Sequence, residues 1–189
     1  LGMDQVVGYG LDAGSATLTP LAQPYVRTIG GGGPRHFTYH PQGGYVYANN
    51  ELANSVNVYR HDEDAGVLIE LQVISTLPDD FSDTSLTADI KITPDGRFLY
   101  CSNRLHDSIA VYAIGADGCL TLVEIAPSLG NFAQNLAITA DGGLLLCANM
   151  GADDKGENVV VFRIDAGSGK LSAVGEPMEI VKPSCIMIV

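Results

Sequence analysis

The sequence predicts an all-β protein, a β-propeller made of four-stranded antiparallel blades. Three observations lead to this fold class: runs in which apolar and polar residues alternate, turn residues (Gly, Asp, Pro) every 8–12 residues, and a repeat of about 50 residues. No longer stretch carries an apolar stripe of helical period bounded by capping signals. Radially repeated four-stranded meanders of this length are typical of propeller blades.

Three turn-like segments mark the repeat. They begin at His40, Thr93 and Thr139, which lie 53 and 46 residues apart, and each is followed by strand-like runs and an Asp/Gly turn. The pattern predicts one partial propeller domain, 1–189, with blades at 33–75, 86–126 and 132–176, a half-blade at 1–22 and a final strand at 184–189.

Three blades do not close a ring, because propellers typically have 4–8 blades. We therefore expect the chain to be the C-terminal part of a larger propeller. A complete chain that closes its ring by association with other copies is the alternative.

Composition excludes several classes of function. The 189 residues contain 10 Lys and Arg against 22 Asp and Glu, a net charge of −12, which disfavours binding to nucleic acid or to anionic membranes. No apolar run is long enough for a transmembrane helix. The four cysteines form no CxxC pair and, with the histidines, no metal-ligand spacing, so we expect no metal, no cofactor, buried thiols at Cys101 and Cys147, and a cytoplasmic location.

Polar residues gather at one predicted end of the blades. In an up-and-down meander, the start of the first strand and the end of the second lie at the same end of the blade. This places Arg35, His36, Glu51, Asp89 and Arg104 together, around the mouth of the central channel because the first strand is innermost. Two of the six arginines would then form an anion site in an acidic protein.

Each of these residues also has a structural interpretation. The two arginines would form ion pairs with Glu51 and Asp89 between blades, and His36 would be a hydrogen-bonded strand residue. Glu51 would be a solvated acid, and Asp89 would cap the strand backbone. Among the other histidines, we expect His40 in a structural turn on the opposite face, His61 in a solvated turn, and His106 beside the rim as an alternative to a loop role.

The motifs at these positions resemble a known family. The ordered set is Gly33-Pro34-Arg35-His36, Asn50-Glu51-Leu52, Ala88-Asp89-Ile90, Thr93-Pro94-Asp95-Gly96-Arg97 and Asn103-Arg104. It is similar to the seven-bladed β-propeller lactonase family, which includes the propeller type of 6-phosphogluconolactonase and is related to a carboxymuconate cyclase. The resemblance covers almost the whole chain.

The resemblance implies hydrolysis of 6-phosphogluconolactone, a small anionic lactone, in the pentose phosphate pathway, with Glu51, Arg104 and Arg35 as catalytic residues. Arg35, His36, Asp89 and Arg104 are expected to bind the substrate. A further family histidine belongs to an earlier blade that this chain lacks, so the 189 residues alone are expected to be weakly active or inactive. The third blade has Ala133-Gln134 where the family usually has Pro-Arg, so one cationic contact is absent.

Two other functions stay open. A carboxymuconate-type cycloisomerase would use the same arginines to hold carboxylates, and a non-catalytic propeller module would bind a partner at the rim or side. A covalent serine mechanism is disfavoured because the chain has no GxSxG nucleophile motif.

Overall fold

The computed structural model describes residues 1–152 and 156–189, which contain 15 strands and no helix. This confirms the all-β fold class. No helix among the described residues is long and apolar enough to cross a membrane. The strands are β1 (Gln5–Asp12), β2 (Thr17–Arg27), β3 (Pro34–Tyr39), β4 (Tyr45–Asn50), β5 (Ser55–Asp62), β6 (Val67–Ser75), β7 (Leu86–Ile92), β8 (Phe98–Arg104), β9 (Ser108–Ile114), β10 (Leu120–Pro127), β11 (Ala133–Ile138), β12 (Leu144–Asn149), β13 (Asn158–Ile164), β14 (Leu171–Ala173) and β15 (Met178–Glu179).

The strands form three antiparallel blades and a two-stranded ribbon. The first blade has the order β3-β4-β5-β6, the second β7-β8-β9-β10, and the third β11-β12-β13-β14, with the short β15 also paired to β13. The ribbon pairs β1 with β2. Each blade is therefore a meander in sequence order, which is the arrangement that the repeat predicts.

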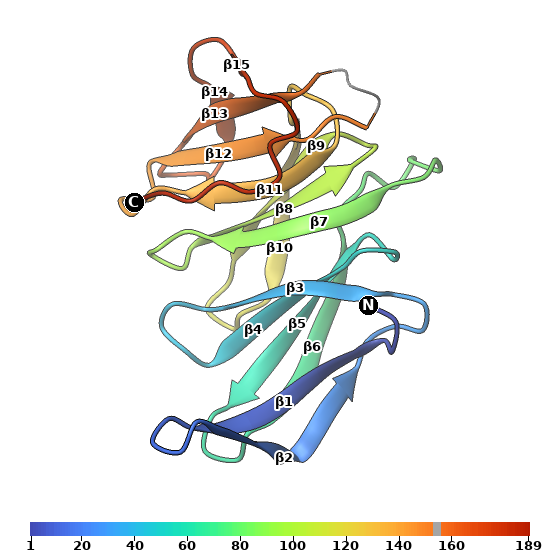
Figure 1. Ribbon diagram of the computed structural model, residues 1–189, viewed down its shortest axis with the longest axis vertical. Helices are drawn as coiled ribbons and strands as arrows, with labels where there is room; N and C mark the ends of the chain where they lie inside the picture. The colour runs from blue at the N-terminus through green and yellow to red at the C-terminus, as the bar shows by residue number, and fades with distance from the viewer. Residues whose placement is uncertain (153–155) are drawn as a thin grey trace.

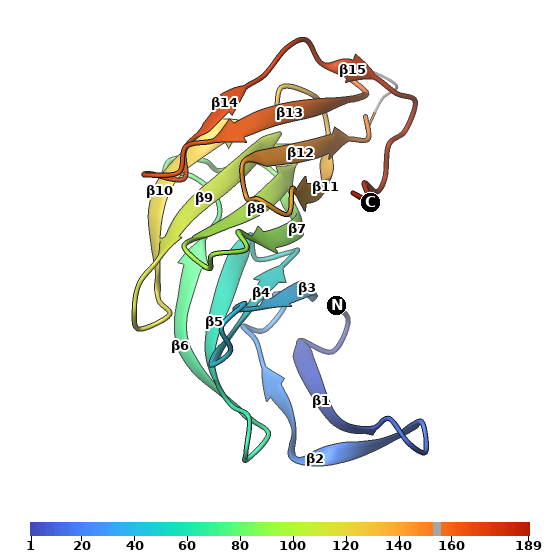
Figure 2. The ribbon, with the colours of Figure 1, turned by 90° about the vertical axis from the view of Figure 1, so that its left-hand side faces the viewer.

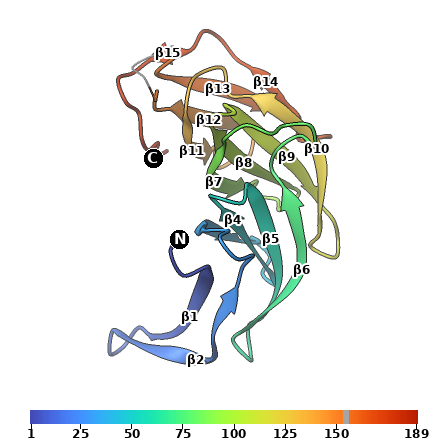
Figure 3. The same ribbon diagram turned by 90° about the vertical axis from the view of Figure 1, so that its right-hand side faces the viewer.

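The sheets stand side by side along an open arc (Figure 1). In Figure 2 the innermost strands β3, β7 and β11 lie on the concave side, together with both ends of the chain, and β6 and β10 lie on the convex side. Figure 3 shows the same arc from the opposite side. The first strand of every blade thus lines the inner surface, where the candidate residues are expected.

The edges of the array differ from the sequence prediction. Residues 184–189 form no strand, because none of the described strands pairs with them in a hydrogen-bonded ladder. The half-blade expected at 1–22 extends to Arg27, since β2 continues along β1. Residues 153–155, which fall within the predicted third blade, lie outside the described residues.

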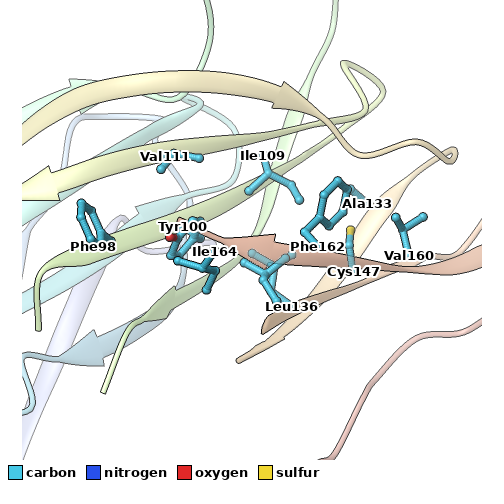
Figure 4. Packing of buried hydrophobic residues seen from close by; sticks show 11 residues of the cluster. Phe98, Tyr100, Ile109, Val111, Ala133, Leu136, Cys147, Val160, Phe162 and Ile164 are labelled. Atoms are coloured by element: carbon cyan, nitrogen blue, oxygen red, sulfur yellow. The ribbon is translucent and has the colours of Figure 1, made fainter. Parts of the chain in front are cut away.

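Apolar side chains between neighbouring blades form the core. Tyr47, Val56 and Val58 of the first blade pack with buried residues of the second. Between the second and third blades, Figure 4 shows Tyr100 and Ile109 facing a cluster that includes Phe162. The core is thus a series of interfaces between sheets, so each blade depends on its neighbours for burial.

A tyrosine and a glycine join each pair of complete blades. The buried hydroxyl of Tyr47 donates to the carbonyl of Gly118 at 2.9 Å, and Tyr100 donates to Gly169 at 2.8 Å. Both glycines lie in the last turn of the following blade with positive φ, 78° and 76°. The ring of Tyr45 occupies the space that a Cβ on Gly118 would need. Only glycine fits this turn without displacing the neighbouring blade.

We expect Gly118→Ala to lower the free energy of unfolding by roughly 1–3 kcal/mol, through backbone strain and the clash with Tyr45. Chemical denaturation measures this difference. Gly30→Ala is the matched control, because a Cβ on Gly30 meets nothing within 4 Å and its φ is not positive. Equal stability of the two variants would contradict the proposed role of the turn.

The outer edge of the ribbon is exposed. Tyr9 of β1 occupies the repeat position of Tyr59 and Tyr112, which are fully buried, yet it is 52% exposed. Leu11 on the same strand is 69% exposed. In the complete blades, the equivalent third strand pairs with a second strand, and β1 has no such partner. An exposed strand edge bearing apolar side chains favours association with other strands.

The isolated 189-residue chain should therefore associate, with an apparent mass by light scattering that rises with protein concentration. Tyr9→Lys should shift this equilibrium toward the monomer, because a charged residue on an edge strand opposes strand pairing. Val181→Lys, at a site that is 83% exposed in the C-terminal segment, serves as the control. A wild-type chain that stays monomeric at all concentrations would show the prediction to be wrong.

Candidate active site

A buried asparagine lies at the end of the second strand, or one residue before it, in each of the three blades and precedes a residue at the rim. The amide nitrogens of Asn50 and Asn103 donate to Ser55 and Ser108 at the start of the third strand, at 2.9 and 3.1 Å. Asn149 makes the equivalent contact with Asn158 at 2.8 Å. The residues that follow these asparagines are Glu51, Arg104 and Met150.

Glu51 lies between two arginines. Its Oε1 accepts a hydrogen bond from Arg104 Nη2 at 2.6 Å, and its Oε2 lies 3.0 Å from Arg35 Nε. The side chains are 15% exposed for Glu51, 9% for Arg104 and 18% for Arg35, so the ion pairs are largely shielded from water. The structure thus brings together the three residues that the resemblance assigns to catalysis.

Contacts with two blades hold Arg104 in place. Its Nε donates to the Leu86 carbonyl at 3.2 Å within its own blade. Its guanidinium lies 5.2 Å from the centre of the Phe132 ring in the loop before the third blade. The Phe132 N–H in turn donates to Asp107 at 2.7 Å. Arg104 is therefore fixed both by charge and by an aromatic face.

A β-bulge places Arg35 and His36 on the same side of β3. Adjacent residues of a regular strand point to opposite faces, but the register of β3 shifts between Pro34 and Phe37. Arg35 Nη1 consequently lies 2.9 Å from His36 Nε2 and donates to the Ala88 carbonyl at 3.0 Å. The freed His36 N–H donates to the side chain of Asn49 at 3.0 Å.

The same shift occurs at the corresponding place in β7 and β11. The residues at these bulges are His36, Asp89 and Asn135, one from each innermost strand. They form a continuous chain: His36 Nδ1 lies 2.9 Å from Asp89 Oδ1, and Asn135 Nδ2 donates to Asp89 Oδ2 at 2.7 Å. Asn135 Oδ1 accepts from the Ile186 N–H at 2.8 Å, which ties the C-terminal segment to the inner surface.

Asp89 is a fully buried carboxylate at the centre of this chain. Besides His36 and Asn135, it accepts hydrogen bonds from the N–H groups of Ile90 and Leu136, each at 2.9 Å, and from Lys91 Nζ at 2.8 Å on both oxygens. Burial raises the pKa of Asp89, but the hydrogen bond from His36, the charge of Lys91 and the Leu136 N–H outweigh it and lower the pKa to about 2. Asp89 is therefore ionised at neutral pH.

The partners of His36 define its protonation. Asp89 accepts a hydrogen bond from His36 Nδ1, so Nδ1 carries the proton. Arg35 donates a hydrogen bond to His36 Nε2, so Nε2 is the acceptor. This is the neutral imidazole with one fixed tautomer. Lys91, Asp89, His36, Arg35, Glu51 and Arg104 thus form one connected network across two blades.

The remaining candidates lie elsewhere. His106 Nδ1 lies 2.6 Å from the Ser108 hydroxyl at the start of β9. The His106 ring packs edge-on against Phe81, in the loop before the second blade, with 4.5 Å between the ring centres. His40 bonds the Gly96 carbonyl at 3.1 Å at the opposite end of the blades, in the expected turn. His61 is half-buried against Tyr39, so the expectation of a solvated turn is wrong.

Two features of the site escaped the sequence prediction. Lys91 contacts Asp89. In the sequence, the one sign of this contact is that Lys91 lies two residues after Asp89 on the same strand. Gln134, named above only as the replacement of a family arginine, has a buried side-chain oxygen without a hydrogen-bond partner among the described residues. A comparison of polar residues at equivalent positions of the three innermost strands is the signal that His36, Asp89 and Asn135 form one row, although it does not reveal the bulges.

The network is positive within an acidic chain. Arg35, Lys91 and Arg104 supply three positive charges against two negative charges from Glu51 and Asp89, so the sum is +1, whereas the chain carries −12. A cavity of about 210 Å³ lies between β3 and β7 and is lined by Arg35, His36, Phe37, Asp89, Ile90 and Lys91. A larger cavity of about 440 Å³, beside β1 and β2, includes none of the charged network.

Comparison with known proteins identifies the class to which this fold and site belong. The model of the family described as "Lactonase, 7-bladed beta-propeller" matches residues 1–188. The chain belongs to this family.

Particular relatives are similar over nearly the whole chain. A 6-phosphogluconolactonase of Bacillus subtilis is 34% identical over 98% of this chain and 51% of its own length. One from Erwinia tasmaniensis is 36% identical, over 96% and 54%. The structure of the periplasmic gluconolactonase of Pseudomonas aeruginosa superimposes with a TM-score of 0.88 at 30% identity, over 97% of this chain and 50% of the other. The chain thus spans about half the length of these proteins.

The lowered pKa of Asp89 predicts a pH-dependent contribution to stability. A carboxyl group with a pKa of about 2 in the fold and 3.8 in the unfolded chain contributes about 2 kcal/mol at neutral pH. Because the pKa is lowered, this contribution is complete above pH 4 and is lost as the pH falls toward 2. Asp89→Asn should therefore unfold more easily than wild type at pH 7, by about 2 kcal/mol or more.

Urea denaturation at pH 7 and pH 3 measures this difference, which should be smaller at pH 3. Asp80→Asn, in an exposed loop, is the control and should leave both values near wild type. An Asp89→Asn deficit that is independent of pH would mean that the charge of Asp89 does not stabilise the fold.

Proposed function

We propose that the protein hydrolyses a sugar lactone, namely 6-phosphogluconolactone to 6-phosphogluconate in the pentose phosphate pathway, without a cofactor. The observation that carries this proposal is the Glu51 carboxylate held between Arg35 and Arg104 on the inner rim. The family relationship supports it, since several relatives are named 6-phosphogluconolactonase. A lactone is a reactive ester, so its hydrolysis requires a positioned water, a base and stabilisation of an oxyanion.

Glu51 is assigned the role of base. One arginine bond on each oxygen fixes the carboxylate and leaves further lone pairs free to accept a hydrogen bond from water. Glu51 takes a proton from this water as the water oxygen bonds to the lactone carbonyl carbon. The bond between this carbon and the ring oxygen then breaks, and the departing oxygen takes the proton held by Glu51 to become a hydroxyl group, which returns Glu51 to its carboxylate form.

The arginines are assigned to the developing negative charge. Within the described residues, Arg35 Nη2 and Arg104 Nη1 have no hydrogen-bond partner, although the other guanidinium nitrogens are held. Pre-oriented donors of this kind stabilise a tetrahedral oxyanion because they need no rearrangement during the reaction. His36 and Asp89 are assigned to substrate binding, through their hold on Arg35.

We also propose a cytoplasmic location. All four cysteines are free, and Cys101 and Cys147 are buried within the blades, as in proteins of reducing compartments. The Pseudomonas aeruginosa relative is described as periplasmic, so cell fractionation is the direct measurement.

In the protein that contains these residues, Arg104→Ala should reduce kcat/KM for 6-phosphogluconolactone by a factor on the order of 10²–10³, the scale for loss of one oxyanion donor. Glu51→Gln should lower kcat more than it raises KM, because it keeps the shape and removes the base. A dehydrogenase-coupled assay of 6-phosphogluconate follows both.

Arg163→Ala, at an exposed arginine on β13, is the control and should behave as wild type. Near-normal turnover in both site variants would exclude the catalytic assignment. Activity on a muconate substrate in place of the lactone, followed by absorbance, would favour the cycloisomerase instead.

A further inference from the structure

We propose that Lys91 forms, with Arg35 and His36, a subsite for the phosphoryl group of the substrate, in the cavity between β3 and β7. This inference deepens the proposed lactonase function and rests on it. It concerns a residue on the innermost strand of the second blade, next to the Arg35–Glu51–Arg104 centre but outside it.

The first argument is that Asp89 has enough hydrogen-bond donors without Lys91. Without the lysine, Asp89 still accepts four hydrogen bonds, from His36, Asn135 and two backbone N–H groups. A carboxylate offers about four lone-pair sites, so these donors satisfy it fully. The bonds from Lys91 are additional, so the ammonium group can turn toward an anion while both Asp89 oxygens keep their hydrogen bonds.

The second argument is the availability of the ammonium group. The Lys91 side chain is 38% exposed, in contrast to Asp89 at 0%. Its third contact, with the Ile90 carbonyl, is 3.4 Å long, beyond the usual range for an N–H donor. One N–H group of the Lys91 ammonium thus makes only a weak hydrogen bond. Lys91 lines a cavity together with Arg35 and His36.

The third argument is the position relative to the reactive centre. Lys91 lies two residues beyond Asp89 on the same strand, and its ammonium group lies 2.8 Å from both oxygens of Asp89, which in turn contacts His36. Arg35 borders both the cavity and Glu51. In a six-membered lactone, the carbonyl carbon and the ring carbon that bears the phosphorylated exocyclic group lie on either side of the ring oxygen. The exocyclic carbon carries the phosphoryl group away from the ring, so the carbonyl is placed at Glu51 and the phosphoryl group at Lys91.

The subsite therefore selects phosphorylated over unphosphorylated sugar acids. Lysine suits a phosphate monoester because it is a compact positive charge with three donors. Binding of two stable probes, 6-phosphogluconate and gluconate, to the 189-residue chain by titration calorimetry tests this selectivity separately from catalysis. We expect wild type to prefer 6-phosphogluconate by roughly tenfold or more.

Lys91→Met should remove most of this preference and leave gluconate binding unchanged, whereas Lys91→Arg should keep it. Lys170→Met, at an exposed lysine in a turn of the third blade, is the control. A thermal melt of each variant checks that the fold is intact, and Lys91→Gln replaces the Met variant if that one is unstable.

Equal binding of the two probes by wild type, or an undiminished preference in the Lys91 variants, would overturn the subsite. A preference for a muconate dicarboxylate over 6-phosphogluconate would overturn it as well. The hydrolysis assay, made on the protein in which the Arg104 and Glu51 variants are tested, keeps the two proposals apart. No hydrolysis of 6-phosphogluconolactone by that protein contradicts the function, and hydrolysis without phosphate-dependent binding contradicts the subsite.

Discussion

The buried charge of Asp89 is the constraint on which the inner surface depends. An ionised carboxylate removed from water needs hydrogen-bond donors on all sides, and a single strand cannot supply them. Asp89 obtains them from three blades: His36 on β3, its own strand β7, and Asn135 with the Leu136 N–H on β11. Blades that otherwise meet through apolar side chains are therefore held in one register at their innermost strands.

The β-bulges make this arrangement possible. In a regular strand, the N–H groups of these positions would pair in the ladder and alternate side chains would point away from the channel. The bulge in β3 places Arg35 beside His36, which contacts Asp89, and the Leu136 N–H of the edge strand β11 donates to the same carboxylate. The same distortion thus supplies donors to a buried charge and positions the arginine that grips Glu51. Stability and the geometry of the site have a common origin, which is frequent for bulges near active sites.

The sequence predicts the blades well because their signal is repeated. Alternating strands, turn glycines and a period of about 50 residues each occur three times, so the four-stranded sheets and the end at which Glu51 and Arg104 lie follow from topology. The bulges do not follow, because a shift of one residue leaves no mark in the alternation of so short a strand. Lys91 was missed for the same reason: its role depends on the position of Asp89, which only the bulge determines.

The edge segments were predicted less well because a strand depends on its partner. Residues 184–189 have the composition of a first strand, yet they form no ladder with any strand of the described residues, and the Ile186 N–H donates to the Asn135 side chain instead. β1 forms but leaves Tyr9 exposed, whereas the same repeat position is buried wherever a second strand is present. Propensity marks these segments as β-structure, and pairing decides whether the structure forms.

The site arises from small differences between equivalent repeat positions. Glu51 and Arg104 occupy the same place in adjacent blades, directly after a buried asparagine, and their opposite charges meet across the gap at 2.6 Å. His36, Asp89 and Asn135 likewise occupy one place in three blades, as a donor, an acceptor and a donor in turn. Identical residues at these positions would repel each other or leave hydrogen bonds unmade. The regular backbone fixes the spacing, and the alternation of chemical character along it converts a structural repeat into a binding surface.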